Sequence, residues 1–174
     1  MRKIINSTYI TLDGVIQDPQ DWPDNGIEGD GTGLKVQTDL LFGCDAMLMG
    51  ARTYAGMAPA WMARSGDPFS DRFNAMAKYV VSSTLTDPEW NNSEVISYDE
   101  VKDLDETLYV SGSGTLVRAL LGDGLLDELH LFMFPIALGA GEKLFLDDAG
   151  QTKLALLETS AYANGVVHLN YGPA

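Results

Sequence analysis

The sequence predicts an α/β protein with a mostly parallel, mixed sheet, helices on both faces and an antiparallel hairpin at the C-terminus. Short apolar segments of strand length alternate along the chain with segments of helical periodicity, and such alternation favours parallel strands joined by helices. Two extended segments near the C-terminus are joined by Ala163-Asn164-Gly165, and Asn-Gly is a strong hairpin signal. The 174 residues fit one domain, 1–174.

The first half of the chain already shows this alternation. β-branched residues predict a strand over 4–10, and apolar residues at helical spacing predict a helix over 34–42. The apolar run 46–49 is too short for a helix and is bounded by Asp45 and Gly50, so we expect a buried strand. The segments that follow are predicted as two helices and a strand: 53–57, 68–77 and 79–82.

The second half repeats the pattern before the hairpin. A strand over 108–110 runs into a glycine-rich turn, and a helix over 115–121 follows, which ends at Gly122. The apolar run 128–134 predicts another strand, which Pro135 ends. Three further segments are predicted as strands: 94–97, 153–162 and 166–171.

Composition and charge exclude several classes of function. The chain is 45% hydrophobic and 21% charged, which is typical of a globular protein. Its formal net charge of −14 argues against nucleic acid or an anionic membrane surface as a partner. Cys44 is the only cysteine and the two histidines lie far apart, so we expect neither a disulfide nor a metal site. With no long apolar run, a soluble cytoplasmic protein is expected.

Residues 13–33 differ most from the rest of the chain. This segment carries six acidic residues, no lysine or arginine, two prolines and five glycines. We expect a long irregular loop, and such loops are usually either functional or disordered. Trp22 favours a functional loop, since a solvated loop has little use for an indole.

The turn that follows 46–49 has the chemistry of a phosphate site. Gly50 lets a ligand approach the backbone, and the helix that opens at Arg52 and Thr53 offers free N–H groups, a hydroxyl and a positive charge. The alternative is a plain turn with a surface arginine and a threonine cap.

A second turn, Ser111-Gly112-Ser113-Gly114-Thr115, follows the strand at 108–110. Small residues and hydroxyls at a helix start can cradle a phosphate. The dinucleotide fingerprint is incomplete, because Val117 stands where a third glycine is expected. A tight turn without a ligand is the alternative.

Two further strand ends carry polar residues. Ser82 and Ser83 could solvate a ribose phosphate, or could simply begin a polar loop. Asp13, followed by Gly14, is placed at a strand end to transfer a proton or to bind a cationic group. An Asp-Gly pair is also a common turn.

These motifs, in this order, resemble the dihydrofolate-reductase-like superfamily, most closely the stand-alone relatives of the reductase domain of bifunctional riboflavin-biosynthesis deaminase-reductases. The segments that carry the resemblance are Leu12-Asp13-Gly14, 45–54, 78–82, 110–116, 127–131 and 135–141. The resemblance implies a three-layer α/β fold that binds NADPH at the strand ends, and it also implies a homodimer.

The resemblance also implies a role for each turn. The Gly50 turn would meet the adenosine phosphate side of NADPH, the two serines the adenine ribose and its 2′-phosphate, and the Gly112 turn the pyrophosphate. Asp13 and Gly14 would border the nicotinamide and the substrate, and the 13–33 loop with Trp22 would cover the substrate. Ala51 stands where folate reductases commonly carry an arginine, so NADPH and NADH both remain open.

We therefore expect an NADPH-dependent reductase that transfers hydride to a carbonyl or imine of a small molecule, with a 5-amino-6-(5-phosphoribosylamino)uracil-type compound as one candidate. Asp13, with a pKa raised by desolvation, would donate the proton. The alternative is that Asp13 stays ionised and only positions a hydroxyl or amine of the substrate. The alternatives are a non-catalytic nucleotide-binding domain or a true dihydrofolate reductase. A folate substrate is disfavoured because only Asp30 and Asp39 flank the position of the expected acid on the first helix.

Overall fold

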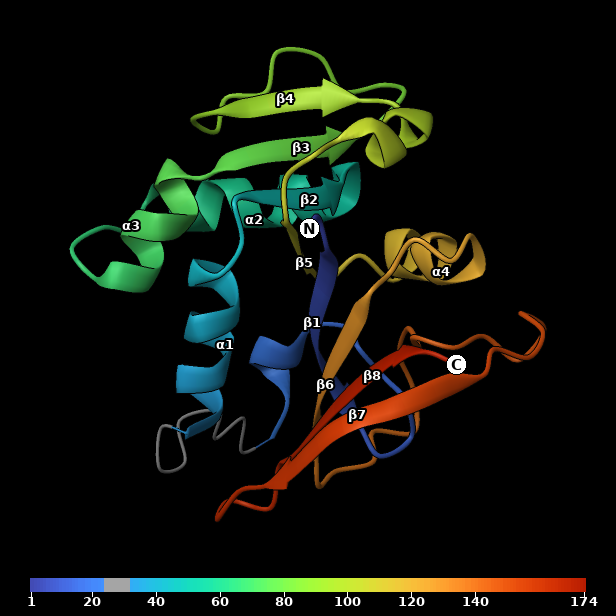
Figure 1. Ribbon diagram of the computed structural model, residues 1–174. Coiled ribbons are helices and arrows are strands. Elements are labelled where there is room, and N and C mark those ends of the chain that lie inside the picture. The colour runs from blue at the N-terminus through green and yellow to red at the C-terminus, as the bar shows by residue number, and fades with distance from the viewer. Residues whose placement is uncertain (24–31) are drawn as a thin grey trace.

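The strands of the computed structural model, which describes residues 1–23 and 32–174, form one mixed sheet (Figure 1). The sheet order is β4-β3-β2-β5-β1-β6-β8-β7. All described neighbours up to β6 run parallel, and β8 is antiparallel to both β6 and β7. The strands are β1 Ile4–Thr11, β2 Ala46–Gly50, β3 Ala77–Val81, β4 Ser93–Ile96, β5 Leu108–Ser111, β6 Glu128–Phe134, β7 Leu154–Ala161 and β8 Val167–Pro173.

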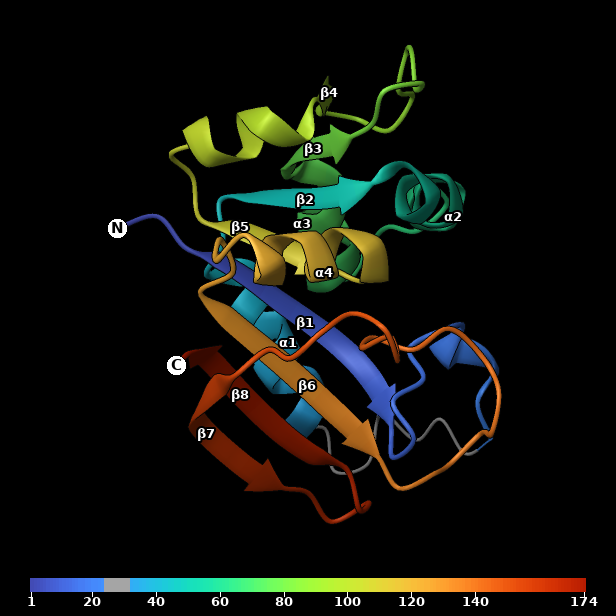
Figure 2. The ribbon, with the colours of Figure 1, turned by 90° about the vertical axis from the view of Figure 1, so that its right-hand side faces the viewer.

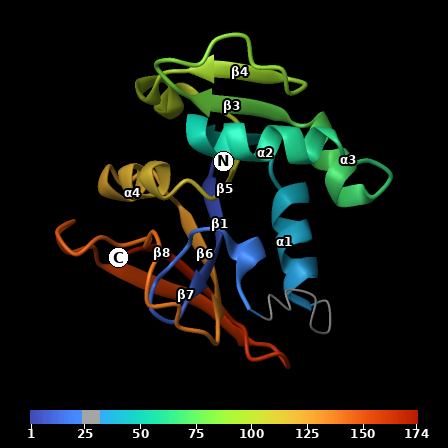
Figure 3. The same ribbon diagram turned by 180° about the vertical axis from the view of Figure 1, so that it is seen from behind.

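Helices cover both faces of this sheet and make three layers. Figure 2 shows α4 in front of the sheet with α1 behind it. Figure 3, seen from behind the view of Figure 1, shows α1, α2 and α3. The α-helices are α1 Thr32–Phe42, α2 Ala51–Met62, α3 Pro68–Ala75 and α4 Gly114–Gly122, and the 3-10 helices are η1 Pro19–Asp21 and η2 Tyr98–Asp103.

Strand β2 is an unbroken apolar run because both of its faces are buried. Side chains alternate between the two faces of a strand. Ala46 and Leu48 pack into the core under α4, whereas Met47 and Met49 pack into the core under α2 and α3. All four are buried, as expected for a strand covered on both faces.

The predicted α/β class, the parallel strands and the C-terminal hairpin are confirmed. The helix predicted over 53–57 is longer, because α2 begins directly after Gly50 and continues through Pro59. The helix predicted over 68–77 ends earlier, since Met76 is extended and β3 begins at Ala77. η2 was not predicted, although Ser97 and Glu100 form a capping box at its start.

Within the described residues, no helix has the length and apolar character needed to cross a membrane. The predicted long loop over 13–33 is described only in part: η1 lies within it, and 24–31 fall outside the described residues.

Candidate functional site

The Gly50 and Gly112 turns meet at the carboxyl edge of the sheet. β2 and β5 are neighbours, so α2 and α4 start side by side. A methyl group placed on Gly50 would lie 2.9 Å from the Ser113 hydroxyl oxygen. A side chain at Gly50 would therefore displace the Ser113 hydroxyl, and the two motifs predicted at strand ends lie in contact.

Both helices begin without a side-chain cap among the described residues. The N-cap of α2 is Gly50, and that of α4 is Ser113, whose φ of 71° lies in the left-handed region. By contrast, Asp67 caps α3 by accepting the Ser70 N–H at 2.9 Å. The first N–H groups of a helix have no intrahelical acceptor. The N-termini of α2 and α4 therefore offer an anion both hydrogen-bond donors and the positive ends of the helix dipoles.

The two glycines of the second turn have different environments. Gly112 has φ +71°, and no described atom lies within 4 Å of a methyl group placed on it. A methyl group on Gly114 would lie 2.9 Å from both Arg118 Nη1 and Ile16 Cδ1. Gly112 therefore borders open space, whereas a side chain at Gly114 would have to displace the ends of neighbouring side chains.

Ser82 and Ser83 lie beside the start of α2, because Val81 pairs with Gly50 across β3 and β2. The Ser82 hydroxyl oxygen accepts the N–H groups of Thr84 at 3.1 Å and Leu85 at 2.9 Å, so it stabilises the turn after β3. Ser83 is exposed. The polar-turn alternative accounts for the Ser82 contacts, and a ribose-phosphate role stays a prediction for both residues.

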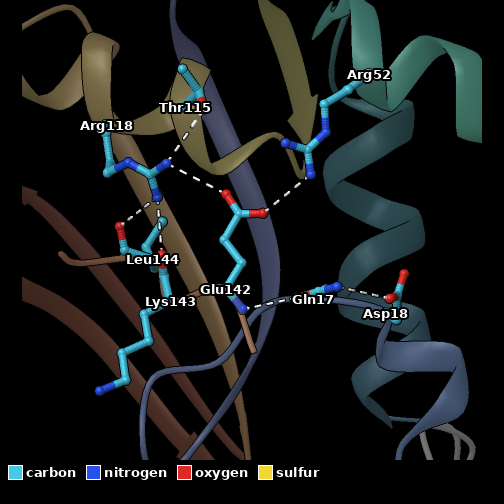
Figure 4. Close-up of polar contacts among 8 residues, drawn as sticks. All are labelled: Gln17, Asp18, Arg52, Thr115, Arg118, Glu142, Lys143 and Leu144. Carbon is cyan, nitrogen blue, oxygen red and sulfur yellow. Dashed lines mark hydrogen bonds and ion pairs between the residues drawn. The ribbon is translucent and has the colours of Figure 1, made fainter. Parts of the chain in front are cut away.

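An ion-pair cluster above the first turn of α4 was not predicted from the sequence (Figure 4). Glu142 lies 3.7 Å from Arg52 and 3.4 Å from Arg118. Arg118 also donates to the carbonyl oxygens of Lys143 and Leu144 and, at 3.4 Å, to the Thr115 hydroxyl. Thr53 is half-buried near the start of α2. The start of α4 is thus lined by two guanidinium groups with a carboxylate between them.

The expected raised pKa of Asp13 is wrong. Its carboxylate accepts hydrogen bonds from the Thr11 hydroxyl at 2.5 Å and from the N–H groups of Leu138 and Gly139 at 3.1 and 2.7 Å. These hydrogen bonds, that from Thr11 foremost, lower the pKa of Asp13 to about 2. Asp13 is therefore an ionised anchor for the segment after β6. This state fits the alternative in which Asp13 stays ionised, and its contact with a substrate stays a prediction.

The two other predicted substrate contacts have structural roles. Gly14 has φ +84°, and its carbonyl oxygen accepts the Leu144 N–H at 3.0 Å. Trp22 is only 6% exposed, because its indole packs edge-on against Phe134 and donates to the Gln17 carbonyl oxygen at 2.8 Å. The structure thus places Trp22 in an aromatic core cluster, and its predicted role over the substrate stays a prediction.

Helix α1 presents an amide to the sheet instead of an acid. Gln37 accepts a hydrogen bond from the Tyr9 hydroxyl and donates to the Ser7 hydroxyl oxygen. Asp39 faces away and pairs with Lys35 at the surface. Asp30, the other flanking acid, lies outside the described residues. Gln37 could not be singled out from the sequence, because its importance depends on contacts with β1.

Comparison with known proteins identifies the family of this chain. The model of the family "RibD C-terminal domain" matches residues 2–168. YyaP, an uncharacterised protein of Bacillus subtilis, is 26% identical over 190 residues, which cover 98% of this chain and 94% of that protein.

Two solved structures are similar in fold. A protein of Shewanella sp. PV-4 whose description relates it to riboflavin biosynthesis superposes with a TM-score of 0.73 at 20% identity, covering 100% of this chain and 99% of that one. A diaminohydroxyphosphoribosylaminopyrimidine deaminase/5-amino-6-(5-phosphoribosylamino)uracil reductase from Thermotoga maritima superposes with a TM-score of 0.68 at 18% identity. The match covers 99% of this chain and 57% of the Thermotoga chain. The predicted dihydrofolate-reductase-like fold is therefore confirmed.

Proposed function

The chain belongs to the RibD C-terminal domain family, and from this we propose that it is a reductase that uses NADPH to reduce a carbonyl or imine carbon of a small molecule. The observation that carries the proposal is the meeting of two uncapped helix N-termini at the Gly50–Ser113 contact. The donors there fit a dinucleotide: they are backbone N–H groups, hydroxyls and a guanidinium group. The open space in front of Gly112 leaves room for the ligand. When bound, NADPH supplies the hydride.

The chain would bind and orient the cofactor through its own groups. The first N–H groups of α2 and α4 would hold the pyrophosphate, together with the hydroxyls of Thr53 and Thr115. Arg52 is largely exposed, and its guanidinium group would exchange the 3.7 Å ion pair with Glu142 for a phosphate. Ser82 and Ser83 would lie toward the adenine ribose, because β3 ends beside the start of α2.

For the substrate we propose a 5-amino-6-(5-phosphoribosylamino)uracil-type compound, which is the substrate class of the Thermotoga enzyme. A folate is disfavoured, because α1 turns the Gln37 amide toward β1 and leaves Asp39 at the surface. Asp13 would shape the substrate end of the site by holding the N–H groups of Leu138 and Gly139.

One observation favours a second candidate, a nucleotide-binding domain without turnover. The predicted acid Asp13 has a pKa of about 2, so it is ionised at neutral pH and cannot donate a proton there. The two candidates share cofactor binding and differ only in catalysis.

Titration with NADPH, followed by tryptophan fluorescence or calorimetry, tests both candidates at once. We expect saturable binding in the low-micromolar range or tighter, a free energy of about −8 kcal/mol. No saturable binding up to millimolar NADPH would refute both. Oxidation of bound NADPH with the pyrimidine compound or with a panel of carbonyls supports the reductase, and binding without turnover supports the second candidate.

A further inference from the structure

The carboxylate of Glu142 occupies the place where an anionic ligand would meet the start of α4. It lies between the guanidinium groups of Arg52 and Arg118 (Figure 4). A methyl group placed on Gly114, the first residue of α4, would be 3.1 Å from a Glu142 carboxylate oxygen. A negative charge of the chain itself therefore lies beside the first residue of α4.

The backbone of Glu142 is held firmly in this position. Its N–H donates to the Gln17 side-chain oxygen at 2.9 Å, and its carbonyl oxygen accepts the Ile16 N–H at 2.8 Å. The next residues pair with the segment after β1, through the bridge between Val15 and Lys143. Any movement of the carboxylate must therefore come from rotation of the side chain.

The contacts that hold the carboxylate are weak enough to exchange. Arg52 is 91% exposed, and its 3.7 Å ion pair has the length and the solvation of a surface pair, which contributes little to stability. Arg118 also donates to the carbonyl oxygens of Lys143 and Leu144, and these hydrogen bonds do not involve the Glu142 side chain. Both guanidinium groups can thus pass from the carboxylate to another anion without loss of the surrounding structure.

We propose that Glu142 competes with the pyrophosphate of the dinucleotide for Arg52, Arg118 and the start of α4, and that its side chain turns away when the dinucleotide binds. The inference rests on the proposed function. Glu142 is thereby a specificity-determining residue. An anionic ligand binds at the start of α4 only if the contacts that the ligand makes elsewhere compensate for displacing the Glu142 carboxylate.

The test is binding to a Glu142→Gln variant, measured by calorimetry at low ionic strength, where charge effects are least screened. Glutamine keeps the size and the backbone hydrogen bonds of Glu142 but removes the charge. We expect NADPH and NADH to bind about tenfold more tightly, the order expected when a like charge beside the phosphates is removed. Asp39→Asn is the control: it makes the same charge change at a surface pair on α1 and should leave affinity unchanged.

A second variant tests whether Glu142 and the dinucleotide compete for Arg52. Arg52→Gln removes an exposed side chain and should leave the fold intact. If Glu142 withholds Arg52 from the ligand, Arg52→Gln weakens dinucleotide binding more in the Glu142→Gln background than in the wild type. Equal losses in the two backgrounds would overturn the inference.

Inorganic pyrophosphate separates this inference from the proposed function. If NADPH and NADH bind to neither the wild type nor Glu142→Gln, the proposed function fails. The inference then stands only if Glu142→Gln binds pyrophosphate more tightly than the wild type. If dinucleotides bind, unchanged or weaker binding to Glu142→Gln overturns the inference, and so does a gain for NADPH alone, because that gain would place the 2′-phosphate at Glu142.

Discussion

Gly112 is the position at which a new side chain tests the cofactor site most directly. Its φ of +71° places it in the left-handed region, and no described atom lies within 4 Å of a methyl group built on it. In Gly112→Leu the side chain would therefore enter the space in front of the turn without displacing the core. Gly114 is a poorer probe, because a side chain there would collide with Arg118 and Ile16.

This geometry predicts two separate effects of Gly112→Leu, one on the free energy of unfolding and one on the free energy of NADPH binding. A residue other than glycine in the left-handed region costs about 1–2 kcal/mol, which a typical stability of about 5–15 kcal/mol can absorb. A hydrogen bond to a charged group contributes about 1.5–3 kcal/mol, so blocking two N–H donors removes about 3–6 kcal/mol of binding. We therefore expect Gly112→Leu to fold and to bind NADPH at least about a hundredfold more weakly.

The assay is NADPH titration by calorimetry, with thermal unfolding to establish that the variant is folded. Gly124→Leu is the matched control: Gly124 has φ +65°, no described atom lies within 4 Å of an added methyl group, and it follows the far end of α4. It should lose similar stability and keep the wild-type affinity. Wild-type affinity in a folded Gly112→Leu variant would refute the assignment of this turn to the pyrophosphate.

Three further predictions follow from other parts of the fold. The pKa of Asp13 is lowered from 3.8 to about 2, so the stability advantage of wild type over Asp13→Asn should be constant above about pH 5 and shrink between about pH 4 and 2, as measured by denaturant unfolding. Burial lowers the pKa of Lys78 from 10.5 to about 8, so wild type should gain stability relative to Lys78→Met as the pH rises from about 8 to 10.5; a pH-independent difference would contradict this. β7 is an edge strand with Leu156 and Leu157 more than half exposed, so we expect a homodimer; light scattering at the 18.8 kDa mass of one chain would exclude it.

The elements of this fold could be predicted because each one is a local pattern. β2 is apolar throughout since it is covered on both faces, and the Asn164-Gly165 turn joins the two final strands. Local information also places both helix starts at one edge of the sheet, because parallel strands end at the same edge. That Gly50 and Gly112 lie side by side depends in addition on β2 and β5 being neighbours, which no local pattern contains.

Other features depend on pairings that no local pattern contains. His130 and His168 are buried side by side, with ring nitrogens 2.9 Å apart, because β6 and β8 are neighbours in the sheet. Gln37 matters only because α1 packs over β1. The sequence spacing alone does not show that the two histidines are partners, or that Gln37 contacts β1.

The error over Asp13 and the omission of Glu142 have the same physical origin. The segment after β1 pairs with the segment after β6, through the Val15–Lys143 bridge and the hydrogen bond between Gly14 and Leu144. This pairing brings the N–H groups of Leu138 and Gly139 to Asp13, which keeps the carboxylate ionised. The same pairing carries Glu142 to the start of α4. The contacts of Asp13 and the position of Glu142 therefore depend on the same pairing of two segments that are distant in the sequence, and no local pattern contains that pairing.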